Sequence, residues 1–196
     1  MFRFTRPSTA EIGEQVAAVA DLVPGNSQFL SLAGGMKTAR LPFAFAHDFS
    51  RTCIGHGQPS FVAAAKAFER WAAFDLGWVH VANPSSPIAV RQIVAVEVQS
   101  LGMWSLNLSQ ILETVNTETS IGFLYSTTKH HIEEGEERFL ITFDIASGKD
   151  WYELEAVSRP RNALAWLGMP ITRAFQRRFR RDSFRRMQEA AEINQG

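Results

Sequence analysis

The densest group of chemically active side chains in this 196-residue sequence lies between residues 129 and 137, where the chain reads KHHIEEGEE. Two imidazoles and four carboxylates therefore fall on one predicted hairpin. Imidazole and carboxylate groups bind divalent cations, and a histidine beside a carboxylate can act as a general base. His131 and Glu136 are the candidate catalytic pair.

Three observations limit the chemistry of this group. Neighbouring strand side chains point to opposite faces, so His130 and His131 do not readily chelate one ion, and no metal site is expected. No nucleophile accompanies the pair, because Cys53 lies in a separate predicted strand. The glycines at 34–35 and 55–57 lack the spacing of a phosphate loop or dinucleotide fingerprint, so no cofactor is predicted.

The acidic run leads into a predicted strand, so either Glu136 or Glu137 must face the side of the apolar residues that follow. That carboxylate could contact the head group of a ligand or form a cross-strand ion pair with Arg159. The ion pair is favoured, although it contributes little where it is exposed. The predicted polar rim of a binding site comprises His131, Glu136, Arg138, Arg159 and Gln176.

Aromatic residues are the second signal, since the chain has 15 Phe, 5 Trp and 2 Tyr. Large rings commonly line apolar pockets, and tyrosine hydroxyls supply the few polar groups that such pockets need. The alternative for any one ring is simple core packing. The predicted ligand-binding wall comprises Trp104, Phe123, Tyr125, Phe139, Phe143, Tyr152, Phe175 and Phe179.

Charge is the third signal, because 20 basic and 20 acidic side chains cancel overall but are segregated along the chain. Residues 97–155 carry 3 basic and 11 acidic side chains, whereas residues 156–196 carry 9 basic and 3 acidic. An arginine-rich helix could meet an anionic surface or could pair with the acidic middle of the chain, and internal pairing is favoured. The seven arginines are Arg173, Arg177, Arg178, Arg180, Arg181, Arg185 and Arg186.

Hydrophobic periodicity predicts the elements that carry these residues. Ser8 and Glu11 have the spacing of a capping box, so a short helix is expected to begin there and to end near Pro24. Apolar residues at helical spacing predict a second helix over 61–74, capped by Ser60, and a long final helix over 171–193. Alternating residues predict antiparallel strands near 47–54, 78–81, 88–99, 106–116, 121–127, 138–145 and 151–157.

This order predicts an α+β fold in which a curved antiparallel sheet of six to seven strands grips the long C-terminal helix. An extra helical segment precedes it. The layout resembles the helix-grip folds of START and birch-allergen-type domains, and that likeness implies an apolar cavity between sheet and helix. We expect a single domain over 1–196, with an N-terminal helix and irregular segment over 1–46 and the helix-grip core over 47–196.

Several classes of protein are excluded by composition. The lone Cys53 allows no internal disulfide and no zinc site with several thiolates. No run of about 18 apolar residues occurs, so no membrane-spanning helix is predicted. The polar N-terminal sequence lacks the apolar core of a signal peptide, and a cytoplasmic location is expected.

Several motifs in fixed order also resemble one family, the domain of unknown function numbered 1990. The motifs are Trp71-Ala-Ala-Phe-Asp-Leu-Gly-Trp78, Leu101-Gly-Met-Trp104-Ser105-Leu106-Asn107, His131-x-Glu133-x-Gly135-Glu136-Glu137-Arg138-Phe139, Ser158-Arg159-Pro160 and Gln176-Arg177-Arg178-Phe179. The sequence departs from the family pattern in the hairpin at 128–130 and at Ser126. The family has no established activity, so the resemblance supports the fold.

Three functions are compatible with these observations. The first is binding of a small apolar or amphipathic molecule between the sheet and the C-terminal helix. The second is an enzyme that acts on a hydrophobic substrate in the same place, with His131 and Glu136 as acid and base. The third is an interaction module that uses the arginine-rich helix on an anionic surface, without base-specific nucleic-acid recognition.

Overall fold

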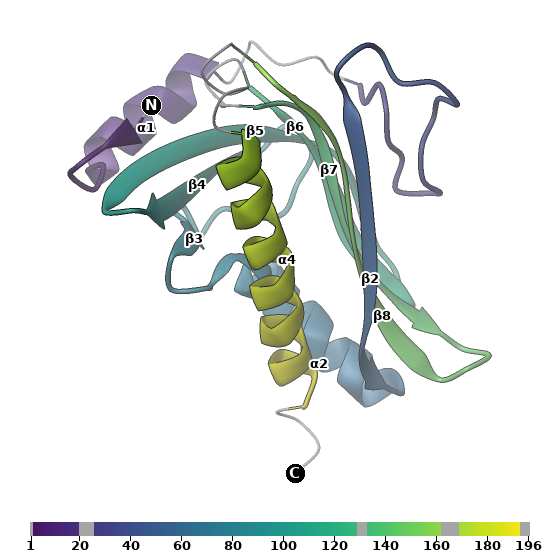
Figure 1. Cartoon of the computed structure of the whole chain (residues 1–196). Helices are drawn as coiled ribbons and strands as arrows, with labels where there is room; N and C mark the ends of the chain where they lie inside the picture. The colour runs from purple at the N-terminus through teal and green to yellow at the C-terminus, as the bar shows by residue number, and fades with distance from the viewer. Residues whose placement is uncertain (1, 20–25, 129–132, 162–168, 193–196) are drawn as a thin grey trace.

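A computed structural model describes residues 2–19, 26–128, 133–161 and 169–192. One antiparallel sheet curls around helix α4 (Met169–Glu192), which lies along its concave face (Figure 1). This arrangement confirms the predicted fold class. In spatial order, the strands are β2 (Ala46–His56), β8 (Lys149–Pro160), β7 (Glu133–Asp144), β6 (Ser120–Thr127), β5 (Met103–Asn116), β4 (Ile93–Ser100) and β3 (Val79–Val81), and the short β1 (Phe2–Arg3) pairs with β5.

Two ends of the sheet are useful landmarks. At the turn end, the chain turns between β7 and β8 at residues 145–148, and at the hairpin end β6 leads into β7 near residues 128–133. Helix α2 (Gln58–Glu69) and the short helix η1 (Ala72–Phe74) cover the concave face toward the turn end, where Gly57 N–H donates to the Gly148 carbonyl over 2.8 Å. Gln176, in the N-terminal half of α4, contacts Glu133 at the start of β7, so this half lies nearer the hairpin end.

Helix α1 (Thr9–Val19) packs on the convex face of the sheet. Ile12 and Val19 are buried against Leu106 and Leu108 of β5. The predicted capping box is present, because the Ser8 amide donates to Glu11 Oε2 over 2.7 Å and the Glu11 amide donates to Ser8 Oγ over 3.3 Å.

Several boundaries differ from the predictions, and three of them have a local explanation. Helix α2 begins at Gln58, before the predicted cap, because Pro59 is tolerated in a first turn where the amides lack helical partners. Ser60 is therefore buried within that first turn. Strand β4 begins at Ile93, five residues later than predicted, after a turn in which Arg91 has a φ of 72°. Strand β7 begins at Glu133 because its acidic residues continue the ladder with β8.

The segment from residue 26 to residue 45 is irregular, as predicted, apart from one bridge between Leu30 and Met36. Leu30 is buried with Leu124 of β6 and Val157 of β8. Since these strand residues face away from α4, the segment covers part of the convex face.

Candidate functional site

Aromatic rings fill the concave face toward the turn end. The ring centroids of Phe123 and Phe139 lie 4.9 Å apart, and Phe74 of η1 lies 5.1 Å from Phe139. Phe68 and Trp71 each lie 5.5 Å from Phe123. Helix α2, Trp71 and η1 thus supply rings that the predicted wall did not include, and they pack this end as a core.

The predicted wall residues divide by burial. Phe123, Phe139 and Tyr152 are at most 1% exposed, so they are core residues in the structure. Half-buried rings lie further out, where Phe179 is 5.4 Å from Phe74 and Phe175 is 5.8 Å from Trp78. Phe143 is also half-buried and lies 6.4 Å from Phe61 of α2.

Between this aromatic layer and the hairpin end lies a group of polar side chains that we call the concave polar cluster: Tyr125, Glu133, Glu137 and Gln176. The Tyr125 hydroxyl donates to Glu137 Oε2 over 2.7 Å. Gln176 Nε2 of α4 donates to both oxygens of Glu133, over 3.0 and 3.1 Å. The cluster therefore joins β6 and β7 to the first half of α4.

Burial dominates the electrostatics of this cluster. Desolvation raises the pKa of Glu133 to about 7, and the neighbouring charge of Glu137 adds to the effect. Desolvation also raises the pKa of the Glu137 carboxyl, against the opposing effect of the Tyr125 hydrogen bond. The pKa of Tyr125 is raised well above its ordinary value by burial and by Glu137. These groups favour their protonated forms more strongly than exposed groups do.

Ion pairs attach α4 to β2 beside the cluster. Asp48 Oδ2 lies 2.5 Å from Arg173 Nη1, and Asp48 Oδ1 lies 3.6 Å from Arg180 Nη2. Arg180 Nη1 also donates to Ser50 Oγ over 2.8 Å. Both arginines are therefore engaged with β2.

The arginines of α4 do pair internally, but not with the acidic middle of the chain. Six of the seven lie within 4 Å of a carboxylate, and the partners are Asp48, Asp75, Asp182 and Glu189. Many carboxylates of residues 97–155 instead pair on the convex face, as in the Glu113–Lys37 and Glu153–Arg51 bridges. Strand side chains alternate, so these carboxylates point away from α4.

Several predicted site residues lie on the convex face. Trp104 lies under the Arg6 guanidinium, whose carbon is 5.3 Å from the ring centroid. Arg138 is 4% exposed and bridges Glu153 at 3.1 Å and Glu155 at 2.7 Å. These residues are thus separated from the concave polar cluster by the sheet itself.

Two other predicted rim residues, Arg159 and Glu136, contact the irregular segment of residues 26–45. Arg159 pairs across the strands with Glu134 at 2.9 Å, whereas the predicted partner was Glu136 or Glu137, and its guanidinium carbon lies 4.8 Å from the Phe45 ring centroid. The Glu136 carboxylate is 2% exposed and accepts the amides of Gln28, Phe29 and Leu30 over 2.5, 3.0 and 2.9 Å. Because this carboxylate accepts three backbone N–H groups, its role is to hold the 26–30 segment.

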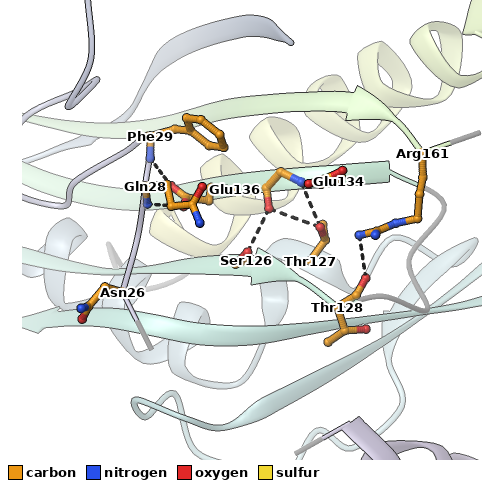
Figure 2. Close-up of a pocket in the computed structure, with 10 residues that line it drawn as sticks. Asn26, Gln28, Phe29, Ser126, Thr127, Thr128, Glu134, Glu136 and Arg161 are labelled. Atoms are coloured by element: carbon orange, nitrogen blue, oxygen red, sulfur yellow. Dashed lines mark hydrogen bonds between the residues drawn. The ribbon is translucent and has the colours of Figure 1, made fainter. Parts of the chain in front are cut away.

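A hollow of about 200 Å³ lies on this side of the sheet, beside residues 26–29 and the ends of β6 and β7. Figure 2 shows the residues that line it. Its polar groups are bonded to one another. Ser126 Oγ and Thr127 Oγ1 each donate to the Gly135 carbonyl over 3.3 Å, and Arg161 Nη2 donates to the Thr128 carbonyl over 3.2 Å. The hollow is therefore interpreted as a gap beside the attached 26–30 segment, and it is not the proposed ligand site.

His131 of the candidate catalytic pair lies outside the described residues. Among the residues that the structure does describe, no group of three or more His, Cys, Asp or Glu side chains is arranged to hold a metal ion. None of the described helices is long and apolar enough to cross a membrane.

The predicted rim took Glu136 in place of Glu137 and left out Glu133, although a usable signal was present. Glu137 has the same strand parity as Phe139 and Ile141, so counting back by two places it on their face. Glu133 follows by the same parity, provided that the strand extends to residue 133. The predicted start at 138 hid this relationship.

The strand order, the concave face and the long gripped helix define an α+β helix-grip domain. A model of the family described as a domain of unknown function, DUF1990, matches residues 32–186, and this chain belongs to that family. It is 35% identical to a UPF0548 protein of Dictyostelium discoideum, over 77% of this chain and 75% of the relative. It is 28% identical to a UPF0548 protein of Deinococcus radiodurans, over 97% of this chain and 99% of the relative.

Solved structures share the fold at low sequence identity. The di-domain ARO/CYC BexL superposes with a TM-score of 0.54 and 13% identity, over 78% of this chain and 52% of that one. A hypothetical protein of Helicobacter pylori superposes with a TM-score of 0.51 and 7% identity, over 81% of this chain and 99% of that one. These likenesses establish the architecture and carry no residue roles.

Proposed function

We propose that this protein binds a small apolar or amphipathic molecule between the concave face of the sheet and the first half of α4. The observation that carries the proposal is the concave polar cluster beside half-buried rings. Ligand sites combine an apolar wall with a few polar groups that fix orientation. Phe175 and Phe179 supply the wall, and Tyr125 and Glu137 supply the polar groups. The ligand wall proposed here leaves out Trp104, which lies on the convex face.

The position of Ala156 suggests a way to block the site. Its Cα pairs with that of Glu137 on one side and that of Asp48 on the other, so its side chain shares their concave face. Ala156 is also only half-buried. Ala156→Phe therefore places a ring beside the cluster. Ala146→Phe is the matched control, because Ala146 is exposed in the turn between β7 and β8.

The test is native mass spectrometry of the protein purified from its source, followed by organic extraction. We expect the unmodified chain and Ala146→Phe to retain an apolar molecule, and Ala156→Phe to lose it. Titration with a neutral apolar dye, Nile red, checks the same site when the natural ligand is lost during purification. The proposal is wrong if the unmodified chain binds neither, or if Ala156→Phe binds as well as the control.

A further inference from the structure

Glu137 is a half-buried carboxylate on the concave face, and one of its oxygens receives no hydrogen bond from the described residues. Its Oε2 accepts the Tyr125 hydroxyl, whereas its Oε1 has no hydrogen-bond partner among the residues that the structure describes. No described cation forms an ion pair with it, because the nearby Arg173 and Arg180 pair with Asp48. Partial desolvation of a carboxylate without a cationic partner is unfavourable, so a cationic group of a ligand would stabilise it.

Two amide oxygens on the same side of the sheet also lack donors. Asn107 of β5 is 8% exposed and donates to Ser105 Oγ over 3.3 Å, but its buried Oδ1 has no partner among the described residues. Gln176 directs its Nε2 toward Glu133, which leaves its buried Oε1 without a described partner.

Register and helix packing place these amides on the concave face. Ile111 of β5 pairs with Tyr125 of β6, and Asn107, four residues before Ile111, has the same parity and therefore shares its face. Gln176 reaches this face from α4. The concave face thus offers three acceptor atoms, Glu137 Oε1, Asn107 Oδ1 and Gln176 Oε1, and no matching donor in the described chain.

We propose that the polar end of the ligand is a protonated primary amine, which donates to Glu137 while its apolar part lies against the half-buried rings. This inference rests on the proposed function. An ammonium group has a positive charge and three donors, which suit a carboxylate that has no cationic partner among the described residues. A ligand carboxylate would instead meet Glu137 and Glu133 at close range, so fatty acids are rejected.

The affinity should depend on pH in a defined direction. A long-chain alkylamine, like lysine, stays protonated up to about pH 10. Burial raises the pKa of the Glu133 carboxyl to about 7 and also raises that of Glu137. Lowering the pH from 8 to 5 therefore removes negative charge from the site and weakens binding of the amine. The groups that face these carboxyls are Tyr125 of β6, Tyr152 of β8, Asp48 of β2 and Arg173 and Gln176 of α4.

The test compares decylamine, decanol and decanoate by isothermal titration calorimetry at pH 8, below their micellar concentrations. We expect decylamine to bind about tenfold or more tightly than decanol, since hydrogen bonds to charged groups contribute about 1.5–3 kcal/mol, and decanoate to bind most weakly. Glu137→Gln should remove the preference for the amine. Glu134→Gln should keep it, because Glu134 neighbours the cluster in sequence but pairs with Arg159 on the convex face.

The outcomes separate the two proposals. If all three molecules bind equally well, or if decanoate binds best, the amine assignment is wrong and the binding site stands. If Glu137→Gln keeps the preference for the amine while its melting curve matches that of Glu134→Gln, Glu137 is not the recognition group. If neither Nile red nor any of the three molecules binds, both proposals are overturned.

Discussion

Glu136 and Glu137 are neighbours in sequence but lie on opposite faces of β7, so the same chemical group does two different things. Glu136 accepts three consecutive backbone amides and thereby attaches residues 26–30 to the convex face. Glu137 contacts Tyr125 under α4. Which carboxylate has a structural role and which faces the proposed ligand is decided by the strand's alternation.

The role of Glu136 predicts a large loss of stability on substitution. Glu136→Gln replaces one carboxylate oxygen with an amide donor that faces backbone donors, so we expect a loss of about 3 kcal/mol in the free energy of unfolding. Urea denaturation measures it. Glu134→Gln, which breaks a bridge between half-exposed side chains, should cost less than about 1 kcal/mol. Equal losses for the two variants would contradict the structural role of Glu136.

On the concave side, different elements cover the two ends of the sheet, and one end is packed with rings while the other has polar contacts. Helix α2 and η1 pack aromatic rings against the sheet toward the turn end, so this region contributes mainly to stability. Helix α4 extends beyond them and meets Glu133 through Gln176 and Asp48 through Arg173. The ligand proposal is therefore confined to the part of the sheet that α4 covers near its N-terminal half.

Close approach of β7 to β8 at this end predicts a second stability effect. A Cβ added at Gly135 would lie 2.1 Å from the Val157 carbonyl oxygen, and a strand backbone has little room to move. Gly135→Ala should therefore destabilise the fold by about 2–3 kcal/mol, as overpacking does. Gly34→Ala is the control, since no atom lies within 4 Å of a Cβ there. A thermal melt of Gly135→Ala that matched the control would show that the strands can separate.

At the scale of the whole molecule, curling the sheet around α4 places desolvated acids on an aromatic face. The stability of the fold therefore depends on pH. The pKa of Glu133 is raised from 4.5 to about 7 in the fold. Between these values the folded chain binds more protons than the unfolded chain, so this group lowers stability as pH rises from about 4.5 to 7. Above pH 7 its effect stays constant.

Glu133→Gln removes that dependence. We expect the variant to gain stability relative to the unmodified chain as pH rises from 5 to 7, and the difference to level off by pH 8. Urea denaturation at pH 5, 6, 7 and 8 measures it. If the free energies of unfolding of the two chains change in parallel over this range, the fold does not raise the pKa of Glu133. Far-ultraviolet circular dichroism of both chains at each pH controls for a change of fold.

The fold was largely accessible from the sequence. Alternation at 138–145 and 151–157, helical spacing at 171–193 and the capping box at Ser8 and Glu11 act over short distances, so each reveals its element directly. The first residues of β7 were missed because a charged run resembles a solvated hairpin, although alternate residues in it face opposite sides. The rings of η1 were missed as neighbours of the sheet because their contact with Phe123 spans about fifty residues.

The sequence by itself determined the α+β helix-grip architecture, because hydrophobic period, turns and helix signals are local properties of the chain. Only the tertiary structure decided which acids lie under α4, which arginines pair with β2 and which rings are core. Trp104 and Arg138 have the residue types of a binding site yet lie on the convex face. The physical reason is that a site depends on which face each strand presents and on what packs there, and curling of the whole sheet sets both.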